Sequence, residues 1–90
     1  ELRITETAGG YTLLTWKAAK DNDPVNAPRY VIYASETYPV DTTKPENIIA
    51  QSVRGTEYVY TSLLPWDRKK CFAVTAIDRY GNEGKAVQGR

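Results

Sequence analysis

The stretch CFAVTAIDRYGNEG, residues 71–84, alternates apolar and polar side chains and then breaks into a charged turn that contains a glycine. A period of two places Phe72, Val74 and Ala76 on one face, which is the pattern of a strand with one buried side. Gly81 supplies the backbone freedom that a chain reversal needs. We therefore interpret residues 78–84 first as a hairpin connection, and any binding role as secondary.

Alternation of this kind recurs along the chain, and no stretch of ten or more residues carries a helical stripe of apolar side chains. The sequence predicts seven short strands, with turn signals about every 8 to 12 residues, as in an antiparallel β-sandwich. A single helical turn is the one alternative for the fourth strand. The predicted strands are residues 2–5, 11–19, 29–35, 46–53, 56–63, 71–77 and 84–89.

The apolar residues of the alternating strands should face inward from both sheets, which predicts one shared hydrophobic core. Cys71 is opposite to Phe72 in the alternation, so we expect it on the outer face of its sheet as an inert thiol. The predicted core residues are Leu14, Trp16, Tyr30, Ile32, Phe72, Val74 and Ala76.

Length and charge limit the classes of protein to which the chain can belong. Ninety residues make one domain, spanning 1–90, with enough chain for a compact core. Twelve basic and eleven acidic side chains give a net charge of +1, which provides no electrostatic case for nucleic acid as a partner. The apolar runs are too short for membrane insertion. Because the chain opens on Glu1 and contains no methionine, we expect it to be a processed product or an excised piece of a larger protein.

The absence of histidine removes the Ser-His-Asp arrangement, the Cys-His pair and nearly every zinc site. The acidic pairs that come closest in sequence are Asp21 with Asp23 and Asp78 with Glu83. All four lie in predicted loops of a sandwich too small for a deep cleft, where burial would not raise the pKa of a general acid. Residues 21–23 lack the further ligands of a calcium site. We therefore expect a protein that is not an enzyme and has no cofactor or metal.

Three segments, in order and at the right spacing, resemble a fibronectin type III domain. TLLTW (12–16) is similar to its second strand, RYVIYAS (29–35) to its third, and LLPWDRKKCFAVTAIDRYGNEG (63–84) to its sixth strand with the flanking loops. The resemblance implies an all-β, seven-stranded, antiparallel immunoglobulin-like β-sandwich, with its two termini at opposite ends.

One position departs from the family pattern. The family usually places a tyrosine at the start of the sixth strand, where its hydroxyl bonds back to the preceding turn. Here Lys69 and Lys70 occupy the places to which that tyrosine could correspond. Trp66 is the residue that we expect to cover this end of the core instead.

A narrower resemblance rests on PENIIAQS (45–52), TEYVYT (56–61) and VTAIDRYGNE (74–83). These segments look like the terminal module of secreted bacterial glycoside-hydrolase-like proteins, especially those of Bacteroides-type gut bacteria. The likeness implies a polysaccharide-handling parent protein and an extracytoplasmic location. It implies nothing about catalysis in these residues.

Two functions from different classes remain open. The first is a non-catalytic structural module, a spacer or docking domain whose partners are the neighbouring domains of its own parent chain. The second is a module that binds carbohydrate or protein through the loops at 21–27 and 79–83. The candidate interaction surface consists of Tyr80, Arg79, Asn82 and Asp23.

Overall fold

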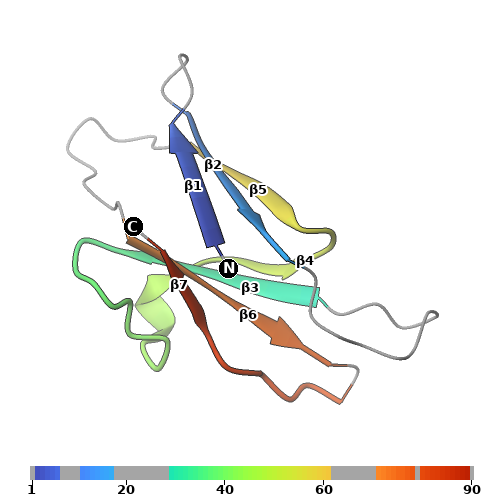
Figure 1. The fold of residues 1–90 in the computed structure, drawn as a ribbon. Coiled ribbons are helices and arrows are strands. Elements are labelled where there is room, and N and C mark those ends of the chain that lie inside the picture. The colour runs from blue at the N-terminus through green and yellow to red at the C-terminus, as the bar shows by residue number, and fades with distance from the viewer. Residues whose placement is uncertain (1, 7–10, 18–28, 62–70, 79, 90) are drawn as a thin grey trace.

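The computed structural model of the chain describes residues 2–6, 11–17, 29–61, 71–78 and 80–89. The described residues form strands, turns and one short 3₁₀ turn, with no α-helix among them (Figure 1). This confirms the prediction of an all-β fold. The strands are β1 (Leu2–Glu6), β2 (Tyr11–Trp16), β3 (Arg29–Ser35), β4 (Ile48–Val53), β5 (Glu57–Thr61), β6 (Cys71–Ile77) and β7 (Val87–Gly89).

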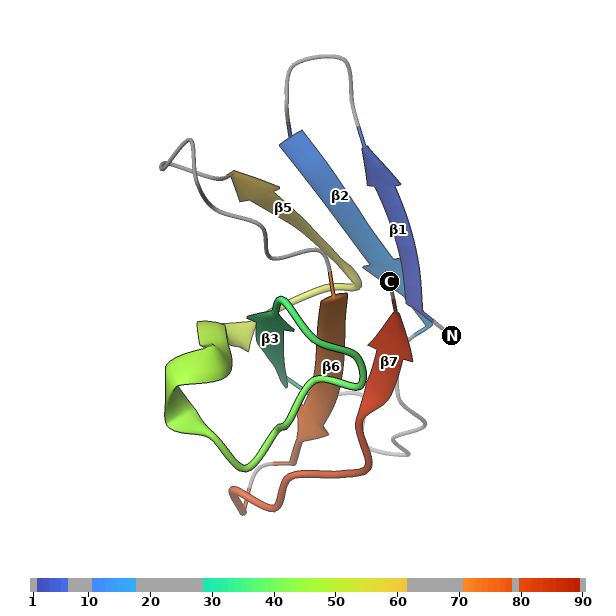
Figure 2. The ribbon, with the colours of Figure 1, turned by 90° about the vertical axis from the view of Figure 1, so that its left-hand side faces the viewer.

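Two antiparallel sheets make up the described structure, in keeping with a β-sandwich (Figures 1 and 2). One has the strand order β1-β2-β5 and is called sheet A here. The other has the order β4-β3-β6-β7 and is called sheet B. β3 and β6 pair over their whole lengths, from Arg29 opposite Ile77 to Ser35 opposite Cys71.

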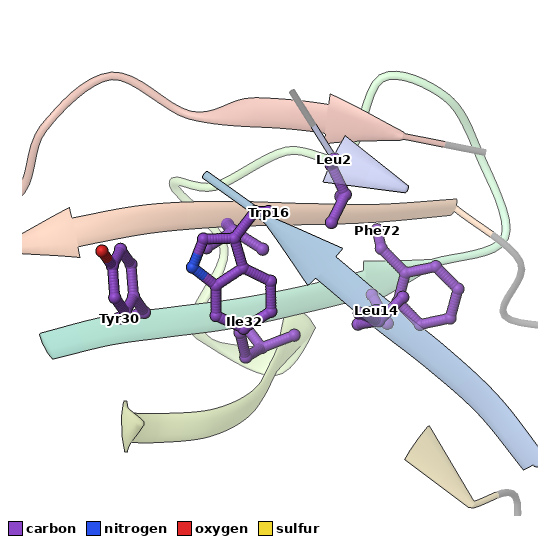
Figure 3. Close-up of a cluster of buried hydrophobic side chains, with 8 residues drawn as sticks. Leu2, Leu14, Trp16, Tyr30, Ile32 and Phe72 are labelled. Atoms are coloured by element: carbon purple, nitrogen blue, oxygen red, sulfur yellow. The ribbon is translucent and has the colours of Figure 1, made fainter. Parts of the chain in front are cut away.

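The hydrophobic core lies between the two sheets and takes side chains from both (Figure 3). The rings of Trp16 and Tyr30 pack edge to face with centroids 5.3 Å apart, and those of Tyr60 and Phe72 do so at 5.5 Å. Such pairs add a small attraction to the apolar area that they bury. All the predicted core residues belong to this cluster, although Ala76 is only partly buried at its margin. The structure therefore confirms the predicted core.

Sheet B is also buried on its other face, where a second cluster consists of Val31, Tyr33, Val40, Cys71 and Ala73. Val40 comes from the segment that follows β3, which crosses this face in Figure 2. The side-chain amide of Gln88 holds that segment in place, because its oxygen accepts from the Val40 N–H at 3.0 Å and its nitrogen donates to the Val40 carbonyl at 3.1 Å. Cys71 is on the predicted face, but it is buried there.

The segment leading into β4 contains the helical turn that the sequence left as an alternative. Pro45–Asn47 form a 3₁₀ turn and the strand begins at Ile48, so a turn and a strand share the predicted range. The Asp41 carboxylate accepts from the N–H of Thr43 at 2.9 Å, and the Asn47 side chain donates to the Asp41 carbonyl at 2.9 Å. These hydrogen bonds hold the segment that leads into β4 in one conformation.

The first and last strands meet side by side. A Cβ built on Gly89 would lie 3.0 to 3.1 Å from side-chain atoms of Leu2 and Ile4, closer than side chains normally approach. Figure 2 shows the end of β7 beside the start of β1. The expectation of termini at opposite ends is therefore wrong for the described residues. The difference arises because β7 is short and packs against β1, and the sequence likeness does not specify that contact.

Candidate functional site

The turn between β6 and β7 is organised by one carboxylate. A bridge between Ile77 and Glu83 closes the turn, and the Asp78 side chain accepts from the N–H groups of Tyr80 and Asn82, each at 2.9 Å. The Asp78 N–H also donates to the Asn82 carbonyl at 3.1 Å. Gly81 has a φ of 85°, a region that costs glycine nothing, so its predicted role in the reversal is confirmed.

Tyr80 lies at the exposed part of this turn, with 72% of its surface open to solvent. Asn82 was predicted to belong to the same interaction surface, but its side chain donates back to the Asp78 carboxylate at 3.2 Å. These hydrogen bonds, the one from the Asn82 backbone N–H above all, hold the pKa of Asp78 below its usual value. The turn therefore presents a large aromatic ring on a backbone that is already fixed.

A second carboxylate, Glu83, ties the turn to the outer face of sheet B. It accepts hydrogen bonds from the hydroxyls of Tyr33 on β3 and Thr75 on β6. Burial raises the pKa of Tyr33 to about 12, and the hydrogen bond to Glu83 and its negative charge act in the same direction. The Tyr33 hydroxyl is therefore un-ionised at neutral pH and serves as a hydrogen-bond donor.

The two carboxylates of this turn bond to different groups. Asp78 accepts from N–H groups of the turn itself, whereas Glu83 accepts from two hydroxyls on the sheet. Asp78 therefore holds the turn itself, and Glu83, through its Oε2 atom, links the turn to β3 and β6.

Sequence reasoning identified Tyr80, Asn82 and Glu83 but missed Tyr33 and Thr75. A partial signal was present, because each of these residues is a polar side chain at an outward position in the middle of a predicted strand. The other predicted positions, Arg79, Asp23 and the loop at 21–27, lie outside the described residues. So do Trp66, Lys69 and Lys70, on which the expectation about the missing tyrosine depends.

In the described part of the chain, cysteine and acidic side chains nowhere gather in a group of three or more that could hold a metal ion. Within the same residues there is no helix with the length and apolar character needed to cross a membrane.

Comparison with known proteins adds no relative to this description. No family model matches the chain, and no curated protein or solved structure matches it either.

Proposed function

We propose that the chain is a fibronectin type III-like, seven-stranded immunoglobulin-like module of a larger, secreted, polysaccharide-handling bacterial protein, in which it is a non-catalytic docking domain. The division of strands between sheets supports the fold assignment. In immunoglobulin constant-type sandwiches the first, second and fifth strands share one sheet, and the third, sixth and seventh share the other. β1, β2 and β5 are likewise separated from β3, β6 and β7 here, whereas β4 departs from the constant-type arrangement because it joins the sheet of β3.

The observation that carries the docking role is the β6–β7 turn. Tyr80 is 72% exposed, yet its own backbone N–H and that of Asn82 both donate to the Asp78 side chain. A ring on a preorganised turn loses little conformational freedom when a partner surface covers it. Tyrosine also gives a large contact area for few rotatable bonds, which is why it is enriched at protein interfaces.

The positions of Leu2 and Gly89 favour docking over spacing. A spacer separates its neighbours by the distance between its own ends, and these two residues lie side by side. Neighbouring domains connected near these two residues would both be attached at the same side of the module. The module would then contact a neighbour through its surface, with the Tyr80 turn as the contact that we propose.

The test is Tyr80→Ala in the parent protein and in the isolated ninety-residue chain. We expect the substitution to lower the melting temperature of the parent by a few degrees and to leave that of the isolated chain unchanged, because only the parent supplies the covering surface. Tyr11→Ala is the control, since Tyr11 is also an exposed tyrosine, at 47%, but lies on sheet A. Equal shifts from both substitutions in the parent would contradict the docking role.

The exposure of Tyr80 favours a second candidate function, the binding of carbohydrate, because sugars pack against exposed aromatic side chains. Titration calorimetry of the isolated chain with polysaccharide fragments separates the two functions. Docking predicts no binding tighter than millimolar. Micromolar binding that is abolished by Tyr80→Ala would replace docking with a carbohydrate-binding module.

A further inference from the structure

The described sheets have four edge strands, and three of them are protected against pairing with another chain. β1 and β7 pack against each other, and β7 has only three residues. β4 pairs irregularly with β3, with register shifts on both sides of Ile32, and its Ser52 has a φ of 55°. Short strands, bulges and covered edges are the devices by which sheet proteins avoid edge-to-edge association.

In the part of the chain that the structure describes, β5 carries none of these devices. It pairs with β2 in one unbroken register from Glu57 opposite Thr15 to Thr61 opposite Tyr11. Its sequence EYVYT contains no proline and no lysine. Among the described residues, no other strand pairs with its second edge. A regular, β-branched and aromatic strand of this kind is a template for a further strand.

One hydrogen bond establishes which backbone groups of β5 point outward. The Trp16 N–H donates to the Thr56 carbonyl at 3.0 Å, so these two residues form a hydrogen-bonded pair of the β2–β5 ladder. Hydrogen-bonded and non-hydrogen-bonded pairs alternate in antiparallel sheets. Tyr58 and Tyr60 therefore direct their N–H and C=O groups toward β2, and Glu57, Val59 and Thr61 direct theirs away from it.

We propose that β5 is a self-association edge, along which the β5 of a second copy of this chain pairs antiparallel about a two-fold axis at Val59. This register sets Val59 opposite its own copy and Glu57 opposite Thr61 of the copy. All three outward donors and all three outward acceptors of each strand are then paired, joining the two copies of sheet A into one continuous sheet.

Charge and side chains favour a second copy as the occupant of this edge. Glu57 is the only charged residue in the strand, and the two-fold axis at Val59 keeps it away from its own copy, which a slipped register centred on Glu57 would not. Tyr58 faces Tyr60 of the copy as an aromatic cross-strand pair. The net charge of +1 gives weak repulsion between copies.

The association is measured by sedimentation velocity of the ninety-residue chain over a concentration series. Six backbone hydrogen bonds and the tyrosine pairs, offset by the cost of association, give an expected dissociation constant of about 0.1 to 1 mM. Val59→Pro removes one outward N–H from each copy and no bond to β2, so it should raise that constant at least about tenfold. A chain that is monomeric throughout the series would overturn the proposal.

Leu13→Lys separates edge pairing from face-to-face stacking. Leu13 lies directly opposite Val59 on the outer face of sheet A, but it belongs to β2, which is paired on both sides. Edge pairing predicts that this substitution leaves the association unchanged. If Leu13→Lys abolishes the association and Val59→Pro does not, the contact is the sheet face and the proposal is wrong.

A charge exchange tests the register itself and does not depend on proline being tolerated. Thr61→Glu places a second carboxylate opposite Glu57 of the copy and should raise the dissociation constant about tenfold. Combining it with Glu57→Lys should restore or exceed the original affinity, whereas Glu57→Lys alone should change it little. Failure of the double substitution to restore the affinity would overturn the Val59-centred pairing.

Discussion

The two sheets share one core but differ in what covers their outer faces. On sheet B, Val40 from the segment after β3 seals a second buried cluster, and Glu83 fastens the β6–β7 turn beside it. On sheet A, the side chains of Tyr11 and Val59 remain about half exposed. The difference shows that alternation identifies the inner face of a strand reliably. Whether the outer face is buried depends on whether a connecting segment packs over it.

A substitution in the shared core should destabilise both sheets at once. Trp16→Ala removes a side chain that is 8% exposed and packs on Tyr30, and should cost about 3 to 5 kcal/mol in free energy of unfolding. For a domain of this size, that loss approaches the whole stability. Urea denaturation measures it, and a cooperatively folding variant with nearly unchanged stability would overturn the core assignment.

Trp16→Phe is the matched variant. The Trp16 indole N–H is buried and finds no hydrogen-bond acceptor among the described residues, so the replacement removes an unmet polar group along with part of the ring. We expect the cost to be clearly below that of Trp16→Ala. Equal costs would mean that an acceptor outside the described residues satisfies this N–H.

The two outer faces are compared directly by truncating one valine on each. Val40→Ala removes two methyl groups from a side chain that is 3% exposed and should cost about 1 to 2 kcal/mol. Val59→Ala acts on a side chain that is 53% exposed and should change the stability by no more than about 0.5 kcal/mol at concentrations where the chain is monomeric. Similar costs at the two sites would remove the distinction between the faces.

The smallest effect at neutral pH concerns the hydroxyl under the β6–β7 turn. The pKa of Tyr33 is about 12 in the folded chain, against 10.0 for a tyrosine side chain in water. The unfolded chain therefore releases this proton first, so the contribution of Tyr33 is fully present below pH 10 and is lost as the pH rises to about 12. Denaturation of the wild type and of Tyr33→Phe across that range measures it. Parallel pH profiles would contradict the buried hydrogen bond.

The inner face was predictable because every predicted core residue alternates within a strand that could be recognised from its β-branched and aromatic content. The burial of the outer face of sheet B was harder to predict. In β3 the run from Tyr30 to Ala34 is buried without interruption, which a continuous apolar stretch can indicate. Its cover was not predictable, because Val40 is a single apolar residue in a loop and its anchor, Gln88, lies 48 residues further along the chain.

At the candidate site, local chemistry was predictable and long-range chemistry was not. Gly81 and the exposed position of Tyr80 followed from the turn sequence alone. The partners of Glu83 depend on the pairing of β3 with β6, which places Tyr33 and Thr75 on the same outer face. That pairing belongs to the tertiary structure, and the spacing of these residues in the sequence does not predict it.

The contact between Leu2 and Gly89 also makes the described chain nearly a closed ring. A short peptide link between those residues would join β7 to β1 without displacing either strand, and new ends could then be opened elsewhere. Gly55 is a suitable place, because it is exposed in the turn between β4 and β5 and a Cβ there would touch nothing within 4 Å. A circular permutant that begins at this turn should keep the same sheets, since adjacent ends are what make such rearrangements tolerable.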